Sequence, residues 1–302
     1  MKKKVLIIGF GSIGKRHAKL LKNFKNISKI YVLTKRKCKN FKKMRNLSEI
    51  NKINPDYILV CSRTREHYKH LSYLEKKISN KVILVEKPLF KDFKNLKIKK
   101  NKVFVGYNLR YHPVVRFIKK YVNGKKIFSV NISCYSHLPN WRKNLNYTET
   151  NSAKKIYGGG ALLELSHEID YFQWIFKKIK KINHTEIRKV SKLKIDTEDS
   201  VSIIGKTDSV NFLIDLNYFS LYSQRLILIH GSNFTLKGDL INNSVEIFKQ
   251  NKRKRIKFKI DENYTYKEQH KSLLNSNYEN SCSYIEGIKL MLLFDKIKVF
   301  GK

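Results

Sequence analysis

Short apolar runs alternate with amphipathic segments over roughly the first 120 residues. Residues 4–8 (Lys-Val-Leu-Ile-Ile) are almost continuously apolar, which is typical of a strand buried on both faces of a parallel sheet. A helical pattern follows through Ile13, His17 and Leu20. Further strands are predicted at 29–34, 56–62, 81–85 and 102–106, with a helix at 66–77. Strands that alternate with helices predict βαβ units and a parallel sheet.

The rest of the chain has a different rhythm. A half-exposed strand is predicted at 126–135, and an apolar helix at 161–176. Turn signals then separate strand-like segments at 200–205, 210–217, 225–230, 234–237, 244–249 and 255–260. This pattern predicts a mostly antiparallel sheet that leaves one face solvated. Two helices, near 266–277 and 283–299, are predicted to close the chain.

Length and composition favour a two-domain globular protein. The chain has 302 residues, of which 41% are hydrophobic, and it contains no apolar stretch long enough to predict a transmembrane helix. The lysines and apolar run at the N-terminus resemble a signal peptide, but the glycines that follow favour a first strand. The four cysteines are widely spaced, which predicts neither disulfides nor a zinc site and favours a cytoplasmic location.

The formal net charge of +40 raises the hypothesis of a polyanion-binding protein. Lysines are spread over the whole chain, however, and the densest runs are short and separate. We therefore interpret the charge mainly as composition, with attraction to an anionic cofactor or substrate as a further expectation. No specific nucleic-acid or membrane partner is predicted.

The strongest local motif is Gly9-Phe10-Gly11-Ser12-Ile13-Gly14, which follows the first strand and opens a helix. In this context the first glycine permits a tight turn, the second lets the backbone approach a pyrophosphate, and the third allows close helix–strand packing. The pyrophosphate would rest on amides at the helix N-terminus. The motif predicts a Rossmann dinucleotide-binding domain.

The end of the second strand bears on the choice of dinucleotide. A carboxylate about 20 residues after the glycines would bind the ribose hydroxyl of NAD. The sequence reads Thr34-Lys35-Arg36-Lys37 instead, a hydroxyl and three cations that suit a 2′-phosphate. We expect NADP in preference to NAD, and NAD stays open.

The C-terminal ends of the later parallel strands face the ligand crevice of such a sheet. Cys61, Ser62 and His67 follow one strand, and Glu86-Lys87-Pro88 follows the next. All of these except Pro88 are predicted to contact the cofactor, and Lys87 is in addition a candidate to stabilise a developing alkoxide on the substrate. His67 and His70 have metal-ligand spacing, but without further ligands we interpret them as helix-surface residues and predict no metal.

A third motif combines an imidazole with carboxylates. Glu164, His167 and Asp170 are spaced i, i+3 and i+6 on the predicted helix 161–176, so that neighbours in the series share a face. A carboxylate beside an imidazole suits general acid–base catalysis, although a buried structural histidine has the same signature.

Other residues are candidates for substrate contact. Those after the fifth strand could line the crevice, and an aromatic loop further on could meet a sugar. The candidates are Tyr107, Asn108, Arg110, Trp141, Arg142, Tyr147 and His167.

Taken in order, these motifs resemble the glucose–fructose oxidoreductase, inositol dehydrogenase and MocA (Gfo/Idh/MocA) family over nearly the whole chain. The shared pattern comprises the glycine motif with Arg16-His17, then His67, Glu86-Lys87-Pro88-Leu89, Tyr107-Asn108-x-Arg110-Tyr111-x-Pro113, Gly158–Gly160 with His167 and Asp170, and the stretch 282–290. The loop 137–142 with residues 165–171 looks like members from surface-polysaccharide and acidic-sugar pathways.

The resemblance implies a fold and an activity. It implies a doubly wound Rossmann domain, residues 1–120, followed by a substrate-binding α/β domain, residues 121–302, whose large open sheet serves in homo-oligomerisation. It also implies NAD(P)-dependent hydride transfer to or from a sugar or nucleotide sugar, with Lys87 contacting the reacting oxygen and His167 as acid and base. Many relatives have an aspartate four residues before the histidine, where this chain has Leu163, so the carboxylate partner is either Glu164 or Asp170.

Two alternatives stay open beside this hypothesis. The same fold could act without net redox, as a nucleotide-binding regulator or a cofactor-assisted lyase. Polyanion binding is the third, and it predicts a steep dependence of affinity on salt.

Overall fold

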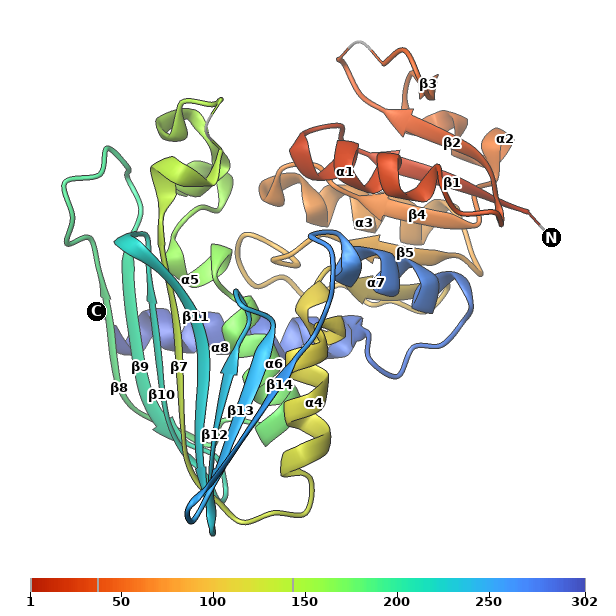
Figure 1. Cartoon of the computed structure of the whole chain (residues 1–302). Helices are drawn as coiled ribbons and strands as arrows, with labels where there is room; N and C mark the ends of the chain where they lie inside the picture. Colours follow the sequence, from red (N-terminus) through yellow and green to blue (C-terminus); the bar gives the residue numbers. More distant parts are fainter. Residues whose placement is uncertain (1, 37, 143, 302) are drawn as a thin grey trace. The chain divides into compact units, whose positions relative to one another are not determined.

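The computed structural model describes residues 2–36, 38–142 and 144–301. The chain folds into two compact units (Figure 1). The first unit comprises residues 1–108 with 266–291, and the second unit comprises residues 109–265 with 292–302. The predicted assignment of cofactor binding to residues 1–120 and of substrate binding to residues 121–302 stays a prediction about function.

The first unit is built on a seven-stranded sheet in the order β3-β2-β1-β4-β5-β6-β15. Every neighbouring pair is parallel except β6 and β15. The strands are β1 (Lys3–Ile8), β2 (Ile27–Leu33), β3 (Lys42–Met44), β4 (Tyr57–Val60), β5 (Val82–Val85), β6 (Lys102–Val105) and β15 (Cys282–Ser283). Its helices are α1 (Ser12–Leu21), α2 (Ile50–Ile53), α3 (His67–Lys77), α7 (Tyr264–Leu274) and the first part of α8 (Tyr284–Phe300). The strand order runs outward from β1 in both directions, which confirms the predicted doubly wound Rossmann sheet.

The second unit contains an eight-stranded sheet in the order β14-β13-β12-β11-β7-β10-β9-β8. Only β7 and β10 pair in parallel, so the predicted mostly antiparallel sheet is confirmed. The strands are β7 (Ile127–His137), β8 (Lys181–Arg188), β9 (Ser200–Lys206), β10 (Asn211–Asn217), β11 (Phe219–Gly231), β12 (Phe234–Asp239), β13 (Ser244–Lys249) and β14 (Lys252–Lys257). The helices are α4 (Pro113–Val122), α5 (Ala161–Glu164) and α6 (His167–Phe176).

Alternation along the strands gives this sheet two different faces. In β10, Phe212 and Ile214 are buried while Leu213 between them is exposed. The helices α4, α5 and α6 contact the sheet through β12, β9, β10 and β7 (Figure 1). Short 3₁₀ turns complete both units at Leu47–Glu49, Thr64–Glu66, Asn108–Tyr111, Leu138–Trp141, Tyr147–Glu149, Asn151–Ala153 and Lys155–Tyr157.

One predicted helix is broken in two. The prediction of a continuous helix over 161–176 is wrong, because α5 ends at Glu164 and α6 begins at His167. Leu165 leaves the helical region with φ −95° and ψ 23°, and the Ser166 hydroxyl donates to the Leu163 carbonyl at 2.7 Å. That bond satisfies a carbonyl at the end of α5 and marks the start of a new helix.

A buried histidine begins α4, a helix that the periodicity did not predict. His112 is 5% exposed; its Nδ1 accepts from the Val114 amide at 3.3 Å, and its Nε2 lies 3.1 Å from Asn243 Oδ1. These contacts describe a neutral ring that caps the helix with Nδ1 and donates through Nε2. Burial lowers the pKa of His112 to about 4.

This lowered pKa predicts acid destabilisation. The unfolded chain takes up a proton at His112 near pH 6.5 and the folded chain only near pH 4, so the contribution of the neutral ring is lost as the pH falls between these values. At pH 5 the loss amounts to about 2 kcal/mol. Urea unfolding of the wild type and of His112→Asn, which keeps a capping side chain that does not titrate, measures it.

The variant should lose less stability than the wild type between pH 7 and pH 5. His184→Asn is the control. Since His184 is exposed, this variant should lose as much stability as the wild type between pH 7 and pH 5. Equal slopes for all three proteins would contradict the assignment of a neutral, buried His112.

Candidate functional site

The candidate cofactor site lies where the strand order of the first unit reverses. β1 pairs with β2 on one side and β4 on the other, and the helices that follow β1 and β4 diverge from this point. Open α/β sheets bind their ligands outside the carboxyl ends of the strands at such a switch point. The glycine motif follows β1 there, and Cys61 and Ser62 follow β4.

Contacts at the first and third glycines leave no room for a side chain. Gly9 has a φ of +96°, and a Cβ on it would lie 2.6 Å from the Cys61 carbonyl oxygen and from the Ser62 amide. A Cβ on Gly14 would lie 2.2 Å from the Gly9 carbonyl oxygen. Both glycines are therefore required by the packing of the turn against β4 and α1.

The second glycine faces open space. A Cβ on Gly11 would meet no atom within 4 Å, so the fold does not demand glycine there. Gly11 is the N-cap residue of α1, and neither a capping side chain nor an acidic residue occupies the first turn. An uncapped helix start with a bare backbone above it fits a pyrophosphate, which would accept hydrogen bonds from the amides. Phe10, Ser12 and Ile13 complete this turn.

The end of β2 presents the predicted ribose-side residues. Thr34 is half-buried and its hydroxyl oxygen accepts from the Arg36 amide at 3.1 Å, while Lys35 and Arg36 are exposed. Lys37, the last residue of the predicted cluster, lies outside the described residues. The described positions hold no carboxylate, so their chemistry fits either a phosphate or a ribose held through the threonine.

His67 joins the loops after β4 and β5. Its Nδ1 lies 3.1 Å from the Pro88 carbonyl and 3.3 Å from that of Leu89, and its Nε2 lies 3.1 Å from the Ser62 carbonyl. At 1% exposure it is not a helix-surface residue, so that interpretation is wrong for His67. Burial lowers its pKa. Its partner in the predicted pair, His70, hydrogen-bonds the Ser62 hydroxyl at 2.9 Å.

Cys61 is buried beneath the glycine turn. Burial raises the pKa of its thiol well above the usual value, with a further contribution from the charge of Glu86. A thiol in this state is a packing residue and not a nucleophile.

Glu86 and Lys87 follow β5 at the same edge of the sheet. The Glu86 side chain turns inward, with Oε1 2.9 Å from His17 Nε2 of α1. Lys87 is half-buried and joined to Pro88 by a cis peptide bond. With Glu86 bonded to His17 on one side and Pro88 bonded to His67 on the other, the backbone that carries Lys87 is fixed at both ends.

In the second unit, two arginine–carboxylate pairs hold the first turn of α6. Arg110 Nη2 lies 2.7 Å from Asp170 Oδ1, and both side chains are at most 3% exposed. Arg225 Nε and Nη2 lie 2.7 and 3.0 Å from the two oxygens of Glu168, which is fully buried. Breaking a fully buried pair such as Arg110–Asp170 costs about 3–5 kcal/mol, and both pairs restrain the first turn of α6.

These pairs change the interpretation of the His167 motif. Glu164 ends α5 and His167 begins α6, so the two do not share a continuous helix face as predicted. The Asp170 carboxylate accepts from Arg110, which was predicted as a substrate residue. The roles of Glu164, Asp170 and Arg110 in catalysis or substrate binding stay predictions. Glu168 and Arg225 were not predicted, because Arg225 is 57 residues away along the chain.

The other predicted substrate residues fall into two groups. Tyr107 and Asn108 follow β6 and are buried, at 1% and 4% exposure. Trp141, Arg142 and Tyr147 line one small cavity of about 10 Å³ in the second unit, together with Leu138, Thr150 and Ser152.

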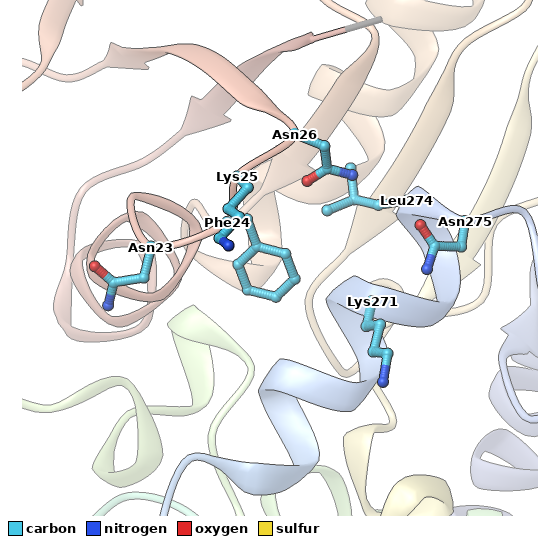
Figure 2. Close-up of a pocket in the computed structure, with 7 residues that line it drawn as sticks. All are labelled: Asn23, Phe24, Lys25, Asn26, Lys271, Leu274 and Asn275. Atoms are coloured by element: carbon cyan, nitrogen blue, oxygen red, sulfur yellow. The ribbon is translucent and has the colours of Figure 1, made fainter.

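A separate hollow in the first unit lies away from the glycine motif. Residues 23–26, which follow the C-terminal end of α1, form one side, and residues from the end of α7 form the other (Figure 2). The ten residues of α1 span about 15 Å, so this hollow and the glycine turn lie at opposite ends of the helix. Its lining residues are Asn23, Phe24, Lys25, Asn26, Lys271, Leu274 and Asn275.

Neither a metal site nor a membrane-spanning helix is found among the described residues. No group of three or more histidine, cysteine, aspartate or glutamate side chains is arranged to hold a metal ion in the part of the chain that the structure describes. Among residues 2–36, 38–142 and 144–301, no helix is both long and apolar enough to cross a membrane.

Comparison with protein families decides what the first unit is. Residues 3–106 match the family model described as an oxidoreductase family with an NAD-binding Rossmann fold, GFO_IDH_MocA. Residues 3–106 therefore carry the Rossmann domain of the Gfo/Idh/MocA family. The match covers the glycine turn, Lys87 and the strands between them, and it confirms the predicted family and NAD as a cofactor of the fold. No curated protein matches the sequence.

Solved structures of Gfo/Idh/MocA proteins share the whole fold. A levoglucosan dehydrogenase in complex with NADH superposes with a TM-score of 0.82 at 15% identity, over 100% of this chain and 97% of that one. The WlbA dehydrogenase from Bordetella pertussis, in complex with NADH and UDP-GlcNAcA, gives 0.77 at 15% identity with the same coverage. A dehydrogenase (MviM) from Clostridium difficile gives 0.75 at 20% identity, over 99% of each chain. At these identities the likeness shows the fold.

The different surroundings of Gly11 and Gly14 predict opposite results for the same substitution. Gly11→Val should change the free energy of unfolding by less than about 1 kcal/mol and weaken NADH binding at least about tenfold, because only the pyrophosphate needs that space. Gly14→Val should destabilise the fold by about 1–3 kcal/mol or more, because its side chain collides with the Gly9 carbonyl. Urea unfolding and NADH titration measure both effects. If Gly11→Val bound NADH as tightly as the wild type, the pyrophosphate would not lie over this turn.

Proposed function

We propose that this protein transfers a hydride between the nicotinamide of NAD(P) and a sugar or nucleotide-sugar carbon that alternates between alcohol and ketone. The observation that carries the proposal is the combination at one sheet edge of a glycine turn that is open above Gly11 and a lysine held at the end of β5. The dinucleotide supplies the hydride chemistry when bound. The chain supplies alignment, charge and proton transfer.

Lys87 would act on the reacting oxygen. As the alcohol loses its proton, negative charge develops on this oxygen, and a fixed ammonium group stabilises it. The constraints on Glu86, Pro88 and Leu89 favour this role, because a catalytic donor must already be in place when the charge develops.

His167 would accept the proton. In the oxidation, the alcohol O–H proton passes to the imidazole, the C–H hydride passes to the oxidised nicotinamide, and the carbon–oxygen single bond becomes a carbonyl. The reduction reverses each transfer. The arginine pairs of Glu168 and Asp170 support this role because they fix the turn on which His167 lies. The role requires His167 and Lys87 to reach the same substrate.

The substrate class rests on the similar structures and on the chemistry of three side chains in the second unit. The levoglucosan dehydrogenase has also been solved in complex with NADH and levoglucosan, and the WlbA dehydrogenase is in complex with UDP-GlcNAcA. Trp141, Arg142 and Tyr147 offer an aromatic face, a cation and a phenol, which suit a sugar ring and an anionic group. Homo-oligomerisation through the open sheet stays a prediction.

The proposal predicts a specific interaction between two substitutions. Lys87→Met and His167→Asn should each lower kcat/KM about 100-fold or more, because each removes a group that acts on the reacting oxygen. Their effects should be far from additive in the double variant, since both groups serve one transition state. NADH formation with levoglucosan, UDP-GlcNAc and UDP-GlcNAcA as probes measures turnover.

Lys91→Met and His184→Asn are matched controls that change a lysine further along the same loop and an exposed histidine. Both should keep wild-type turnover. Full turnover by Lys87→Met would remove the proposed role of the lysine, and strict additivity would mean that the two residues serve different steps.

Dinucleotide selectivity follows from the end of β2. If Lys35 and Arg36 bind a 2′-phosphate, then Lys35→Ala and Arg36→Ala should each weaken NADPH binding about tenfold and leave NADH binding unchanged. Lys22→Ala, at the far end of α1, removes the same charge as a control. Equal effects on both dinucleotides would favour NAD as the physiological cofactor.

A further inference from the structure

Four buried polar side chains form one hydrogen-bonded chain inside the first unit. Glu86 Oε1 lies 2.9 Å from His17 Nε2, His17 Nδ1 lies 2.8 Å from His270 Nε2, and His270 Nδ1 lies 3.0 Å from the Tyr57 hydroxyl. They come from the end of β5, from α1, from α7 and from β4. Their exposed fractions are 9% for Glu86, 0% for both histidines and 1% for Tyr57.

With Glu86 ionised and both rings neutral, the donors and acceptors fit together in one direction. An ionised carboxylate only accepts hydrogen bonds, so His17 donates to Glu86 through Nε2–H. The Nδ1 of a neutral His17 then accepts from His270 Nε2–H, and His270 Nδ1 accepts from the Tyr57 hydroxyl. In this arrangement all three bonds point toward Glu86. Burial lowers the pKa of His270 well below its usual value, and the neighbouring His17 acts in the same direction.

The chain ends beside the candidate catalytic lysine. Glu86 immediately precedes Lys87, and its carboxylate has little freedom, since a Cβ at Gly106 would lie 2.9 Å from Oε1. Glu86 is the only one of the four side chains with appreciable solvent exposure, because Tyr57 and the two histidines are at most 1% exposed. A chain that is buried from Tyr57 to His17 suits holding a carboxylate in place better than conducting a proton to the surface.

We propose that His17 and His270 are positioning residues that act through Glu86 to fix the Lys87 ammonium group against the reacting oxygen. The proposal rests on the proposed function of Lys87. It gives α7, which the chain forms nearly 180 residues after β5, a direct part in the site through His270. Loss of the His270 donor leaves His17 Nδ1 unsatisfied, frees the Glu86 carboxylate and lets the lysine move.

The hydrogen-bonded chain itself can be tested without substrate. ¹⁵N spectra of histidine-labelled protein, with His17→Gln and His270→Gln for assignment, should show both rings neutral with the proton on Nε2. A protonated ring, or the opposite tautomer at His270, would overturn the proposed direction of the chain.

The positioning role requires a kinetic test. His270→Phe keeps a ring of similar shape but no hydrogen bond, and misplacement of a catalytic group by about 1 Å costs about 100-fold in rate. We expect kcat to fall about 10- to 100-fold, with NADH affinity unchanged within about twofold, on whichever probe of the sugar panel turns over fastest. His270→Gln, which keeps an N–H donor, should recover most of kcat.

The Lys87→Met background separates positioning from a general structural effect. A residue that acts through Lys87 has nothing to act on once the lysine is gone, so His270→Phe should cause no further loss there. An equal loss in both backgrounds, or a lower melting temperature with unchanged kcat, would overturn the proposal. If His270→Phe does not fold, Tyr57→Phe, which removes the hydroxyl bonded to His270 Nδ1, carries the same comparison with a smaller effect. Full turnover by Lys87→Met alone would instead contradict the proposed function.

The matched control lies next to His270 on the same helix. Lys271 is exposed on α7 and lines the hollow after α1 (Figure 2). Lys271→Gln should leave kcat, NADH affinity and the histidine spectra unchanged. A loss of kcat in this variant equal to that of His270→Phe would show that any change in α7 disturbs the site, and would overturn the specific role of His270.

Discussion

The rest of the first unit depends on the close contact between the Gly9–Gly14 turn and the backbone at the end of β4. No side chain fits at Gly9 or Gly14, because the backbone atoms of Cys61, Ser62 and Gly9 already fill the space. This contact determines where α1 begins. It directs the amides at the start of α1 toward the ligand crevice at the carboxyl ends of the strands. It also places His17, one turn further along α1, against the carboxylate that precedes Lys87. The binding of a dinucleotide and the placement of the lysine thus follow from the same contact.

Buried carboxylates recur beside the candidate catalytic residues. The chain has 24 acidic residues against 64 lysines and arginines, so an acidic side chain rarely lacks a cation at the surface. In the interior the partners are specific: Glu86, next to Lys87, is bonded to His17, and Glu168, next to His167, is bonded to Arg225. Because a buried charge is costly unless its hydrogen bonds are satisfied, each pair restricts the backbone next to it. In the proposed mechanism, a buried carboxylate bonded to its partner would hold the backbone next to each of the two reacting residues.

Much of the fold could be predicted because it is encoded locally. The strands β4 and β5 are short apolar runs, and the glycine motif places its chemistry within six consecutive residues. The edge strand β8 was missed because most of its residues are polar and exposed, which hides the alternation. The break between α5 and α6 was missed because residues 161–176 are apolar almost throughout, and one serine hydroxyl decides where the first helix ends.

The contacts that complete the site were beyond sequence reasoning. His17 and His270 are 253 residues apart, and no local sequence pattern around either histidine indicates the other as its partner. The same holds for Arg110 and Asp170, which were predicted separately for substrate binding and catalysis and are bonded to each other. Sequence spacing therefore gave the candidate residues, and only tertiary structure gave their partners.

The most direct test of this account is a crystal structure of the protein with bound NADH. The account predicts that the pyrophosphate lies over Gly11 and accepts hydrogen bonds from the first amides of α1, with the nicotinamide at the carboxyl ends of β4 and β5, beside Lys87. A dinucleotide bound elsewhere, or a pyrophosphate held by lysine side chains away from the glycine turn, would contradict it.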